Sequence, residues 1–548
     1  MILFIDLDKN KDKGVLKGEY LDTIREHFSI KDTKANLKKK LFKTRFIADR
    51  IYCITQSGRF EIGLLPDIIR FLKTLNTPFK IILSEEFKER YKTSYNFEDG
   101  LIYPLAIEPR DYQLEGLKRG LQYGSGIYLF PTGSGKTLLM AMLIHNISKR
   151  IDNTKVLLVT LTHLIDQIYD EFVDYGINPK DICKWSGTNE LNPNSKVVIC
   201  GTNILYNKID NLPLEIKKAK IVYLTLQKKL KEDLTLNEVE TRKLIDDSDD
   251  VRKQIERLER RVEPNQKVHE YLKSINLFLL DECHTIKKDN KLDDFFKFLS
   301  TRQRFLFTGT LPESKIDEWN LIGKSGPVIH DVERKELVER KYITDVDVRI
   351  LKIFYKNPNI YFDGMIDDTE KLDEDLPTAN YQLEIDYIIG NQFRNNIIKK
   401  IVEKTDKNIL ITVDRILHGE ILYKLFSDTL QNKQIYFIRG KTEDEERNEI
   451  KKLMECNTNV VCIAITKIFS TGINIKNLHY IMFASSGKAK TKIIQTIGRG
   501  VRKLEGKEKV VIFDIADMLL YNTKHLESRL ILYDNEGIKH KTTEIKEI

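Results

Sequence analysis

The stretch PTGSGKT, residues 131–137, has the residue types of a phosphate-binding loop. It follows the apolar run GIYLF and precedes the helical pattern LLMAMLIHNI, which is the strand–loop–helix context that such a loop requires. Glycines let backbone N–H groups turn toward phosphate oxygens, and the next helix directs its positive end at them. We expect a nucleotide to be held by Pro131, Thr132, Gly133, Ser134, Gly135, Lys136 and Thr137.

The first position of the usual pattern is glycine, and here it is Phe130. We expect Phe130 to end the preceding strand, where an apolar side chain packs inside the protein. Lys136 is predicted to reach the β- and γ-phosphates and Thr137 to ligate Mg²⁺. The alternative for this stretch alone is an ordinary glycine-rich turn between a strand and a helix.

A second motif supplies the acidic groups that such a loop needs. In LFLLDE, residues 277–282, four apolar residues are followed by Asp281 and Glu282. The carboxyl end of a strand in an α/β sheet is where ligands bind. We therefore predict that Asp281 holds Mg²⁺ and that Glu282 takes a proton from the attacking water as the general base. A solvated strand end is the alternative for this motif alone, but the two motifs together favour a site that hydrolyses ATP with Mg²⁺.

The elements that must position these groups are short apolar, β-branched runs that alternate with helical patterns. Such alternation indicates parallel sheets with right-handed crossovers. The runs occupy 155–160, 196–200, 277–282, 304–310, 408–413, 434–440, 460–466, 479–485 and 509–515. These runs are too many for one domain, so we predict an α/β fold with two tandem domains that meet near Gly326-Pro327.

Three segments stand outside this alternation. Residues 1–105 are predicted to form a small α+β domain with a basic stretch at 31–46. Residues 223–272 are rich in charge and carry apolar residues at helical spacing, which predicts a helical insertion that forms a solvated arm, as a hairpin. These apolar residues are Val251, Ile255, Leu258 and Val262. The acidic stretch 355–382 is predicted to be a surface loop. The predicted domains are therefore 1–105, 106–326 with the insertion, and 327–548.

Composition sets broad limits. Among the 548 residues, 41% are hydrophobic and 31% charged, an ordinary globular balance. The six cysteines form no CxxC pair, which argues for a reducing compartment and against a zinc or disulfide framework. The net charge of +8 permits nucleic-acid binding but does not diagnose it. No signal peptide or membrane span is apparent, so we expect a cytoplasmic protein, in the host cytoplasm if a phage encodes it.

Taken together, PTGSGKT and DECH resemble the superfamily 2 helicases, and other motifs of that family follow in the same order. The resemblance implies two RecA-like domains and places Gln113, in EPRDYQ, at the adenine and Arg110 among the residues that bind the nucleotide. It also implies that some threonines contact a nucleic-acid backbone and that others couple the ATP state to it. The contacting threonines are Thr160 and Thr162 in VLLVTLTH and Thr202 in ICGTN, and the coupling threonines are Thr308 and Thr310 in FTGTLP.

The second predicted α/β domain also matches. The resemblance implies that Thr466, in ITKIFSTGINI, contacts nucleic acid and that Gly472 lies near ATP. Asn474 stands where the family commonly has aspartate. The stretch QTIGRGVRK carries Gln495, Arg499 and Arg502 with the family spacing, and the two arginines are expected to meet the charge of the γ-phosphate in the transition state.

The stretch HFSIKDTKANLKKKLFKTRF and the later GLLPDII are similar to the first domain of UvsW-type phage recombination helicases. That resemblance implies ATP-driven branch migration, unwinding or annealing of branched DNA, with phage replication or recombination proteins as partners. The basic stretch is the predicted DNA contact, with Lys38, Lys39, Lys40, Lys43 and Arg45. An RNA helicase or RNA-dependent ATPase and the motor subunit of a restriction or nuclease complex stay open as alternatives.

Overall fold

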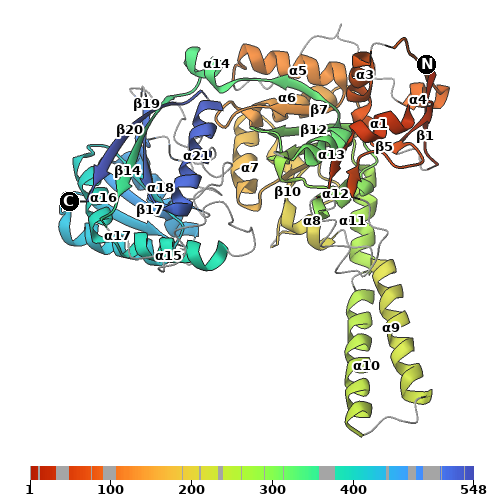
Figure 1. Cartoon of the computed structure of the whole chain (residues 1–548). Helices are drawn as coiled ribbons and strands as arrows, with labels where there is room; N and C mark the ends of the chain where they lie inside the picture. Colours follow the sequence, from red (N-terminus) through yellow and green to blue (C-terminus); the bar gives the residue numbers. More distant parts are fainter. Residues whose placement is uncertain are drawn as a thin grey trace. The chain divides into compact units, whose positions relative to one another are not determined.

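The structure is a computed structural model of the chain. It describes residues 2–9, 13–32, 49–75, 77–90, 107–187, 189–208, 212–232, 238–260, 262–288, 290–312, 314–356, 377–439, 444–466, 475, 477–485, 507, 509–535 and 537–547. The chain divides into two compact units, one of residues 1–129 with 137–331 and one of 130–136 with 332–548. The predicted boundary near Gly326-Pro327 lies close to the division at 331, and each unit is described below by itself (Figure 1).

The first unit begins with a small mixed sheet in the order β5-β2-β1-β6. Its strands are β1 (Ile2–Leu7), β2 (Gly14–Gly18), β5 (Arg59–Phe60) and β6 (Lys80–Leu83), and its helices are α1 (Leu21–His27), α3 (Leu65–Thr74) and α4 (Glu85–Arg90). A separate antiparallel pair is formed by β3 (Ser29–Lys31) and β4 (Arg50–Tyr52). The predicted small α+β domain is therefore present. Most of its basic stretch, including all five predicted DNA-contacting residues, lies outside the described residues.

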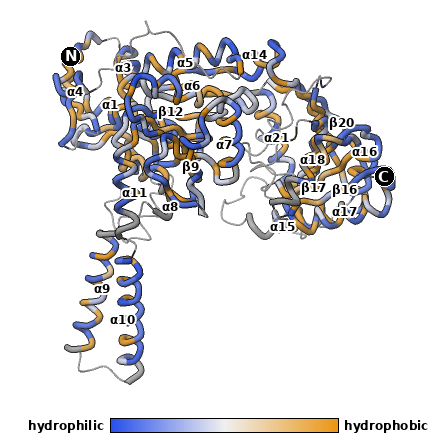
Figure 2. Tube along the Cα trace, turned by 180° about the vertical axis from the view of Figure 1, so that it is seen from behind, coloured by the Kyte–Doolittle hydropathy of each residue, from blue (hydrophilic) through white to orange (hydrophobic). Residues whose placement is uncertain are grey.

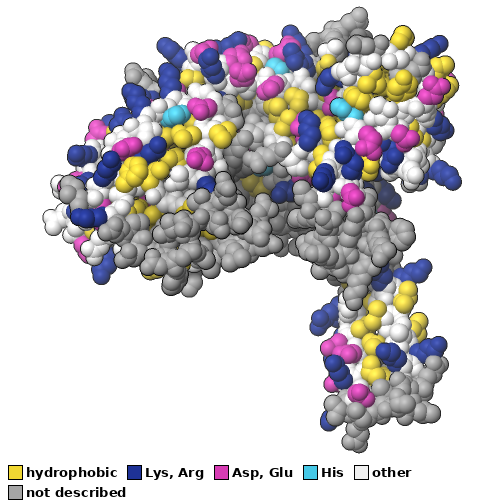
Figure 3. Space-filling view, viewed as in Figure 1, with side chains coloured by type: hydrophobic (Ala, Val, Ile, Leu, Met, Phe, Trp, Pro, Cys, Tyr) yellow, Lys and Arg dark blue, Asp and Glu magenta, His cyan; other side chains and the backbone are white. Residues whose placement is uncertain are grey.

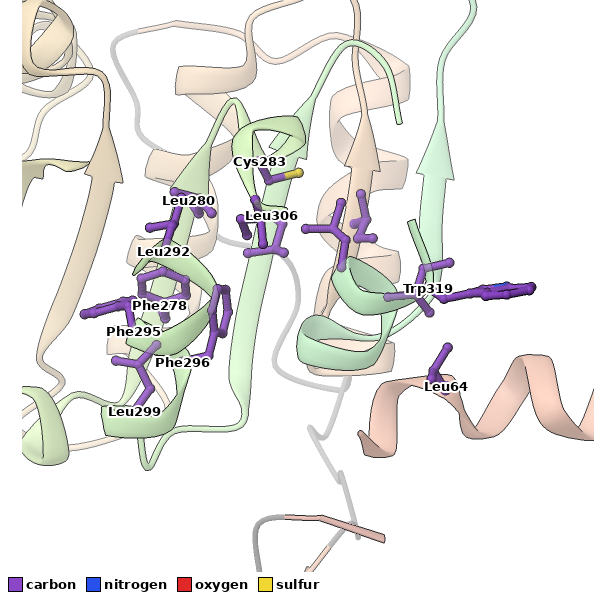
Figure 4. Packing of buried hydrophobic residues seen from close by; sticks show 14 of the residues in the cluster. Leu64, Phe278, Leu280, Cys283, Leu292, Phe295, Phe296, Leu299, Leu306 and Trp319 are labelled. Atoms are coloured by element: carbon purple, nitrogen blue, oxygen red, sulfur yellow. The ribbon is translucent and has the colours of Figure 1, made fainter. Parts of the chain in front are cut away.

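This small domain packs directly on the α/β domain that follows it. A Cβ atom at Gly63 would lie 2.1 Å from the carbonyl oxygen of Ile322, so only glycine allows this approach. Beside it, the Lys324 ammonium lies 2.8 Å from the Glu61 carboxylate, and the Lys324 side chain is only 6% exposed. Figure 4 shows Trp319 and Leu64 within the hydrophobic cluster that both domains share. The small domain is thus held to its neighbour by a common core and a buried ion pair.

The first α/β domain is built on a seven-stranded sheet in the order β13-β7-β12-β11-β8-β10-β9, and every described pairing in it is parallel. The strands are β7 (Gly126–Leu129), β8 (Val156–Thr160), β9 (Ile182–Trp185), β10 (Val197–Gly201), β11 (Leu277–Asp281), β12 (Gln303–Thr308) and β13 (Val328–Asp331). The helices include α5 (Asp111–Tyr123), α6 (Lys136–Ser148), α7 (Ile165–Asp174), α8 (Thr202–Lys208), α12 (Lys291–Phe295) and α13 (Lys315–Ser325). The central strands are buried on both faces, as continuous apolar runs predict.

The insertion consists of three helices, α9 (Leu212–Glu232), α10 (Glu238–Glu259) and α11 (Val262–Ser274). Helices α9 and α10 form a hairpin that extends from the first α/β domain (Figure 1). The predicted helical insertion is confirmed, although it starts before residue 223. Helix α11 is not a solvated arm, because Val268, Tyr271 and Leu272 are buried in the domain core.

The second unit contains another seven-stranded sheet, in the order β16-β17-β15-β18-β19-β14-β20, again with parallel pairings. Its strands are β14 (Asp345–Phe354), β15 (Ile409–Val413), β16 (Gln434–Ile438), β17 (Val460–Ile465), β18 (Tyr480–Phe483), β19 (Lys509–Asp517) and β20 (Lys539–Lys546). Its helices are α14 (Arg334–Glu339), α15 (Pro377–Gly390), α16 (Gln392–Lys404), α17 (Ile416–Thr429), α18 (Asp444–Cys456) and α21 (Leu520–Asn535). Residues 377–382, predicted as loop, belong to α15, and 357–376 lie outside the described residues.

Successive residues along these strands enter two different cores. Val460 and Cys462 of β17 join a cluster with residues of α18 and α21, whereas Val461 and Ile463 join one with residues of α16 and α17. Because side chains alternate along a strand, helices cover both faces of the sheet. Figure 2 accordingly shows hydrophobic segments around β16 and β17. The predicted α/β class with two tandem parallel-sheet domains is confirmed.

A buried ion pair stabilises the second sheet. The Arg394 guanidinium donates to both carboxylate oxygens of Asp517, at 2.7 and 3.1 Å, and to the carbonyl oxygen of Ala484, at the end of β18. His418 Nε2 lies 3.4 Å from the same guanidinium. Burial and the nearby positive charge lower the pKa of His418 to about 3, so this histidine is neutral in the folded protein.

Among the described residues, no helix is both long enough and apolar enough to cross a membrane.

Candidate ATP site and nucleic-acid interface

The loop at residues 130–136 has the backbone conformation that phosphate binding requires. Gly133 and Gly135 have φ angles of 87° and 82°, in the left-handed region that favours glycine. Alternation of such residues with ordinary ones turns consecutive N–H groups into a concave anion-binding nest. The loop connects β7 to α6, whose first residues Lys136 and Thr137 are half-buried while the rest of the helix is largely buried. The core therefore holds the helix that would direct its positive end at a phosphate.

Phe130 explains how the loop works without its first glycine. It directly follows β7, and its side chain is fully buried. The prediction that an apolar side chain packs inside the protein here is confirmed, although β7 itself ends one residue earlier, at Leu129. The turn itself depends on Gly133 and Gly135.

The two acidic residues lie where β11 ends. Asp281 is the last residue of β11, which lies between β12 and β8 in the sheet. Glu282 follows with φ 53° and ψ 49°, a left-handed conformation that is rare for a residue with a side chain and costs about 1–3 kcal/mol. Thr285 stabilises this turn by donating from its hydroxyl to the Glu282 carbonyl at 3.0 Å. Backbone strain of this kind concentrates at functional sites.

The residue after Glu282 anchors the turn. Cys283 is fully buried, and Figure 4 shows it beside Leu306 of β12. Asp281 and Glu282, by contrast, are only partly buried. The buried thiol thus fixes the backbone next to the acidic pair, which lies at the carboxyl edge of the sheet, where the strand before the phosphate loop also ends.

His284 is a residue to which the sequence motifs gave no role. Its Nδ1 lies 3.0 Å from the Thr308 hydroxyl and 3.2 Å from the Glu282 carboxylate. The Thr308 hydroxyl donates to the Thr310 carbonyl at 2.9 Å, so the hydrogen between His284 and Thr308 must come from Nδ1. A single N–H group is therefore shared between the predicted general base and the predicted coupling threonine. In the sequence, the position of His284 two residues after Glu282 in DECH was the feature that could have indicated this role.

The start of α5 is the predicted adenine contact. The Gln113 side chain is buried, and its Oε1 accepts from the backbone N–H of Arg110 at 2.9 Å. This bond caps helix α5, so the Gln113 side-chain oxygen, which was predicted to contact adenine, already accepts a hydrogen bond that stabilises the fold. Arg110 donates to the Tyr112 hydroxyl, and the Tyr112 carbonyl lies 3.0 Å from His330 Nε2 of β13. Helix α5 is thereby fixed to the edge strand of the sheet.

The predicted backbone-contacting threonines of the first α/β domain differ in exposure. Thr160, the last residue of β8, is fully buried, whereas Thr162 is exposed and Thr202 is half-buried. Thr162 lies directly over Gly201, where an added Cβ would be 2.4 Å from the Thr162 hydroxyl. Gly201 therefore brings Thr162 next to Thr202, at the carboxyl ends of neighbouring strands β8 and β10. Of the three threonines, Thr162 and Thr202 are accessible at the protein surface, whereas Thr160 is buried beneath them.

In the second unit, Thr466 follows β17, and its hydroxyl donates to the Val413 carbonyl at the end of β15 at 3.1 Å. The remaining predicted site residues of this unit, Gly472, Gln495, Arg499 and Arg502, lie outside the described residues.

Comparison with protein families assigns the class. Residues 106–313 match the family "Type III restriction enzyme, res subunit", and residues 393–503 match the family "Helicase conserved C-terminal domain". The first range contains the phosphate loop, the acidic pair and the His284–Thr308 contact. The chain belongs to the superfamily 2 helicases and carries the ATP-dependent helicase domains of these enzymes.

Among curated proteins, the chain is similar to the ATP-dependent DNA helicase uvsW of Enterobacteria phage T4. The two are 24% identical over 483 residues, which cover 85% of this chain and 81% of the relative. The crystal structure of T4 UvsW aligns over all of both chains with 20% identity and a TM-score of 0.42. A fragment described as an HsdR subunit of a type I restriction enzyme from Vibrio vulnificus YJ016 aligns over 94% of this chain and 82% of its own, with 14% identity and a TM-score of 0.52. The last likeness is one of fold alone.

Proposed function

We propose that this protein is an ATP-dependent DNA helicase or translocase that acts on branched DNA, by branch migration, unwinding or annealing, in recombination and repair. The observation that carries the proposal is the similarity to the phage T4 DNA helicase uvsW, which extends well beyond the two family ranges. A motor of this kind grips backbone phosphates, so its binding is independent of sequence and sensitive to salt.

The proposed ATP chemistry follows from the groups at the sheet edge. The loop N–H groups and Lys136 bind the phosphates, and Glu282 orients the attacking water and accepts its proton. The Thr137 hydroxyl and the Asp281 carboxylate are oxygen donors of the kind that Mg²⁺ prefers, so these residues fit the ion. Bound Mg²⁺ would supply charge neutralisation between the phosphates. Gln495, Arg499 and Arg502 are proposed to complete the site, with the two arginines on the γ-phosphate.

The proposed coupling route begins at the general base. The N–H group of His284 is shared between Glu282 and Thr308, and Thr308 in turn holds the Thr310 backbone. A change in the charge or position of Glu282 during hydrolysis would change how the His284 N–H group is divided between Glu282 and Thr308. The change would then be transmitted to the Thr308–Thr310 loop. Thr162 and Thr202 are proposed to contact the DNA backbone from neighbouring strand ends, with Thr160 as their buried support and Thr466 as a contact from the second unit.

The small first domain is proposed to bind DNA as well. Its basic stretch, with Lys38, Lys39, Lys40, Lys43 and Arg45, connects β3 to β4. The end of β4 is tied to the helicase core, because Lys288 donates to the Tyr52 carbonyl at 2.9 Å.

A second candidate is the motor subunit of a restriction complex. The family match at 106–313 and the fold shared with the HsdR fragment favour it. Such a motor would translocate on unbranched duplex DNA and would give cleavage only together with a nuclease. An RNA helicase is the other alternative, since the helicase domains do not distinguish RNA from DNA.

Steady-state ATPase measurements with different polymers separate these functions. Rates are compared with no polymer, single-stranded DNA, linear duplex DNA, a four-way DNA junction of the same base composition, and RNA. We expect the junction to stimulate most and to be converted to duplex products in a strand-displacement gel. Equal stimulation by linear duplex would favour the restriction motor, and stimulation by RNA alone would refute the proposal.

A further inference from the structure

Helix α9 of the inserted hairpin has one side packed and one side exposed. Ala219, Ile255 and Leu258 form a small buried cluster between α9 and α10, with Ile216 and Tyr223 packed against it. A Gln227–Ser248 hydrogen bond and a Lys220–Glu259 ion pair, both 2.8 Å, join the two helices. The buried positions of α9 therefore recur at 216, 219 and 223, on one face of the helix.

The opposite face of α9 is apolar in its middle. Ile221, Val222 and Leu224 are 55%, 49% and 65% exposed. The hydroxyl of Thr225 donates to the Ile221 carbonyl at 2.8 Å, so its polar group is turned to its own backbone. Figure 2 shows hydrophobic segments along α9, while α10 is largely hydrophilic. Large apolar side chains grouped in this way on a solvated helix mark an interaction site.

Lysines border this apolar centre at both ends. Lys217 and Lys228 are exposed and share the helix face of Ile221 and Leu224, with spacings of four, three and four residues. We call these four residues the outer α9 stripe; Val222 lies on the adjacent row of the helix, between Lys218 and Lys229. Lys218 and Lys229 repeat the arrangement next to it. In Figure 3, hydrophobic side chains on the hairpin accordingly reach the surface among lysines and arginines.

We propose that the outer α9 stripe docks an amphipathic helix of a partner protein, with an apolar centre and acidic residues near both of its ends. Two side chains separated by one helical turn are the usual anchors for a docked helix. Flanking charges of opposite sign fix its register and its choice of partner. This interaction is distinct from ATP hydrolysis and from DNA binding.

The charge pattern disfavours a second copy of this chain as the occupant. If two α9 helices met face to face, lysines would lie opposite lysines in both the parallel and the antiparallel orientation, which is destabilising. The exposed face of α10 does not complement the stripe either, because charged residues such as Asp246 and Asp250 occupy its centre. DNA would satisfy the lysines but would leave Ile221 and Leu224 against phosphate and water.

The test uses two synthetic helical peptides of equal length and the whole protein. Both peptides carry leucines at one-turn spacing; one has glutamates and the other has lysines at the ends. By fluorescence anisotropy we expect the acidic peptide to bind, less tightly at high salt, and the basic peptide not to bind. The variant Leu224→Ser should weaken binding about tenfold or more. The double variant Lys217→Glu, Lys228→Glu should exchange the preference of the protein for the two peptides.

Ile531→Ser is the matched control, because Ile531 is 62% exposed on α21 and should leave binding unchanged. All variants should keep wild-type ATPase and thermal unfolding, which separates a lost contact from a lost fold. Absence of acidic-peptide binding would overturn the proposal. So would binding of a single-stranded DNA oligonucleotide that needs both lysines but not Leu224, or a dimer in sedimentation that Leu224→Ser dissociates.

Discussion

The shared hydrogen bond of His284 predicts that the general base and the coupling loop act as one unit. His284→Ala removes the donor to both Thr308 and Glu282, at 3.0 and 3.2 Å. Hydrogen bonds to charged groups contribute about 1.5–3 kcal/mol and neutral ones about 0.5–1.5 kcal/mol. If the bonds act in the transition state, His284→Ala should lower the DNA-stimulated kcat at least about tenfold, and Thr308→Val about two- to tenfold.

A double-mutant cycle tests this coupling. Because both changes remove the same N–H···O contact, their losses should be less than additive, with a coupling energy of about 0.5–1.5 kcal/mol. The double variant should still be slower than His284→Ala alone, because Thr308→Val also removes the bond to the Thr310 carbonyl. The assay is steady-state ATPase at saturating ATP, with and without a DNA junction, and basal kcat should fall less than stimulated kcat. Thr308→Ser keeps the hydroxyl and serves as the control with near-normal rates. Strictly additive losses, or equal losses with and without DNA, would refute the coupling.

Four further predictions concern the ATP site and stability. Lys136→Ala should abolish ATP turnover. Glu282→Gln should still bind a fluorescent ATP analogue and retain DNA in a filter assay, but it should fail to hydrolyse ATP. Normal hydrolysis by Glu282→Gln would disprove the role of Glu282 as the general base. Burial alone would raise the pKa of Glu61, but Lys324 and Lys13 hold it below its usual value. The ion pair therefore stabilises the fold at neutral pH, and this stabilisation is lost as the pH falls through the lowered pKa. Glu61→Gln should therefore lower the free energy of unfolding by about 3–5 kcal/mol at pH 7, with the difference from wild type shrinking in acid, as measured by urea unfolding and tryptophan fluorescence. The pKa of His418 is about 3 in the folded protein, so between about pH 6.5 and 3 this side chain binds a proton only on unfolding. The free energy of unfolding should therefore fall by roughly 1.4 kcal/mol for each unit by which the pH is lowered in this range, and His418→Gln should reduce that slope. An unchanged slope would contradict the assignment.

Most central strands could be predicted because strands covered on both faces need continuous apolar, β-branched runs. Each predicted run, from residues 155–160 to 509–515, overlaps an observed strand. Strand β20 was missed, because it lies at the sheet edge and its sequence KHKTTEIK is mostly polar and exposed. The short edge strand β9 was missed as well, since residues 182–185 give too little periodicity to distinguish from a loop.

The ATP groups could be predicted because local chemistry dictates them. A turn with left-handed residues needs Gly133 and Gly135, and a carboxylate after an apolar strand lies at the ligand-binding edge. The exposure of each threonine could not be predicted in this way. Thr160 and Thr162 share one motif, yet one is buried and the other exposed, because the strand ends between them.

The amino-acid sequence by itself determined the class of this protein: its motifs and their order define a superfamily 2 helicase, since phosphate binding and base catalysis require particular residue types at local spacings. Only the tertiary structure decided which distant groups meet. It brought His284 to Thr308, and it placed Gly63 against the Ile322 carbonyl. It also turned Ile221 and Leu224 away from α10. Such pairings depend on how strands and helices pack in three dimensions, which the residue types along the chain do not specify.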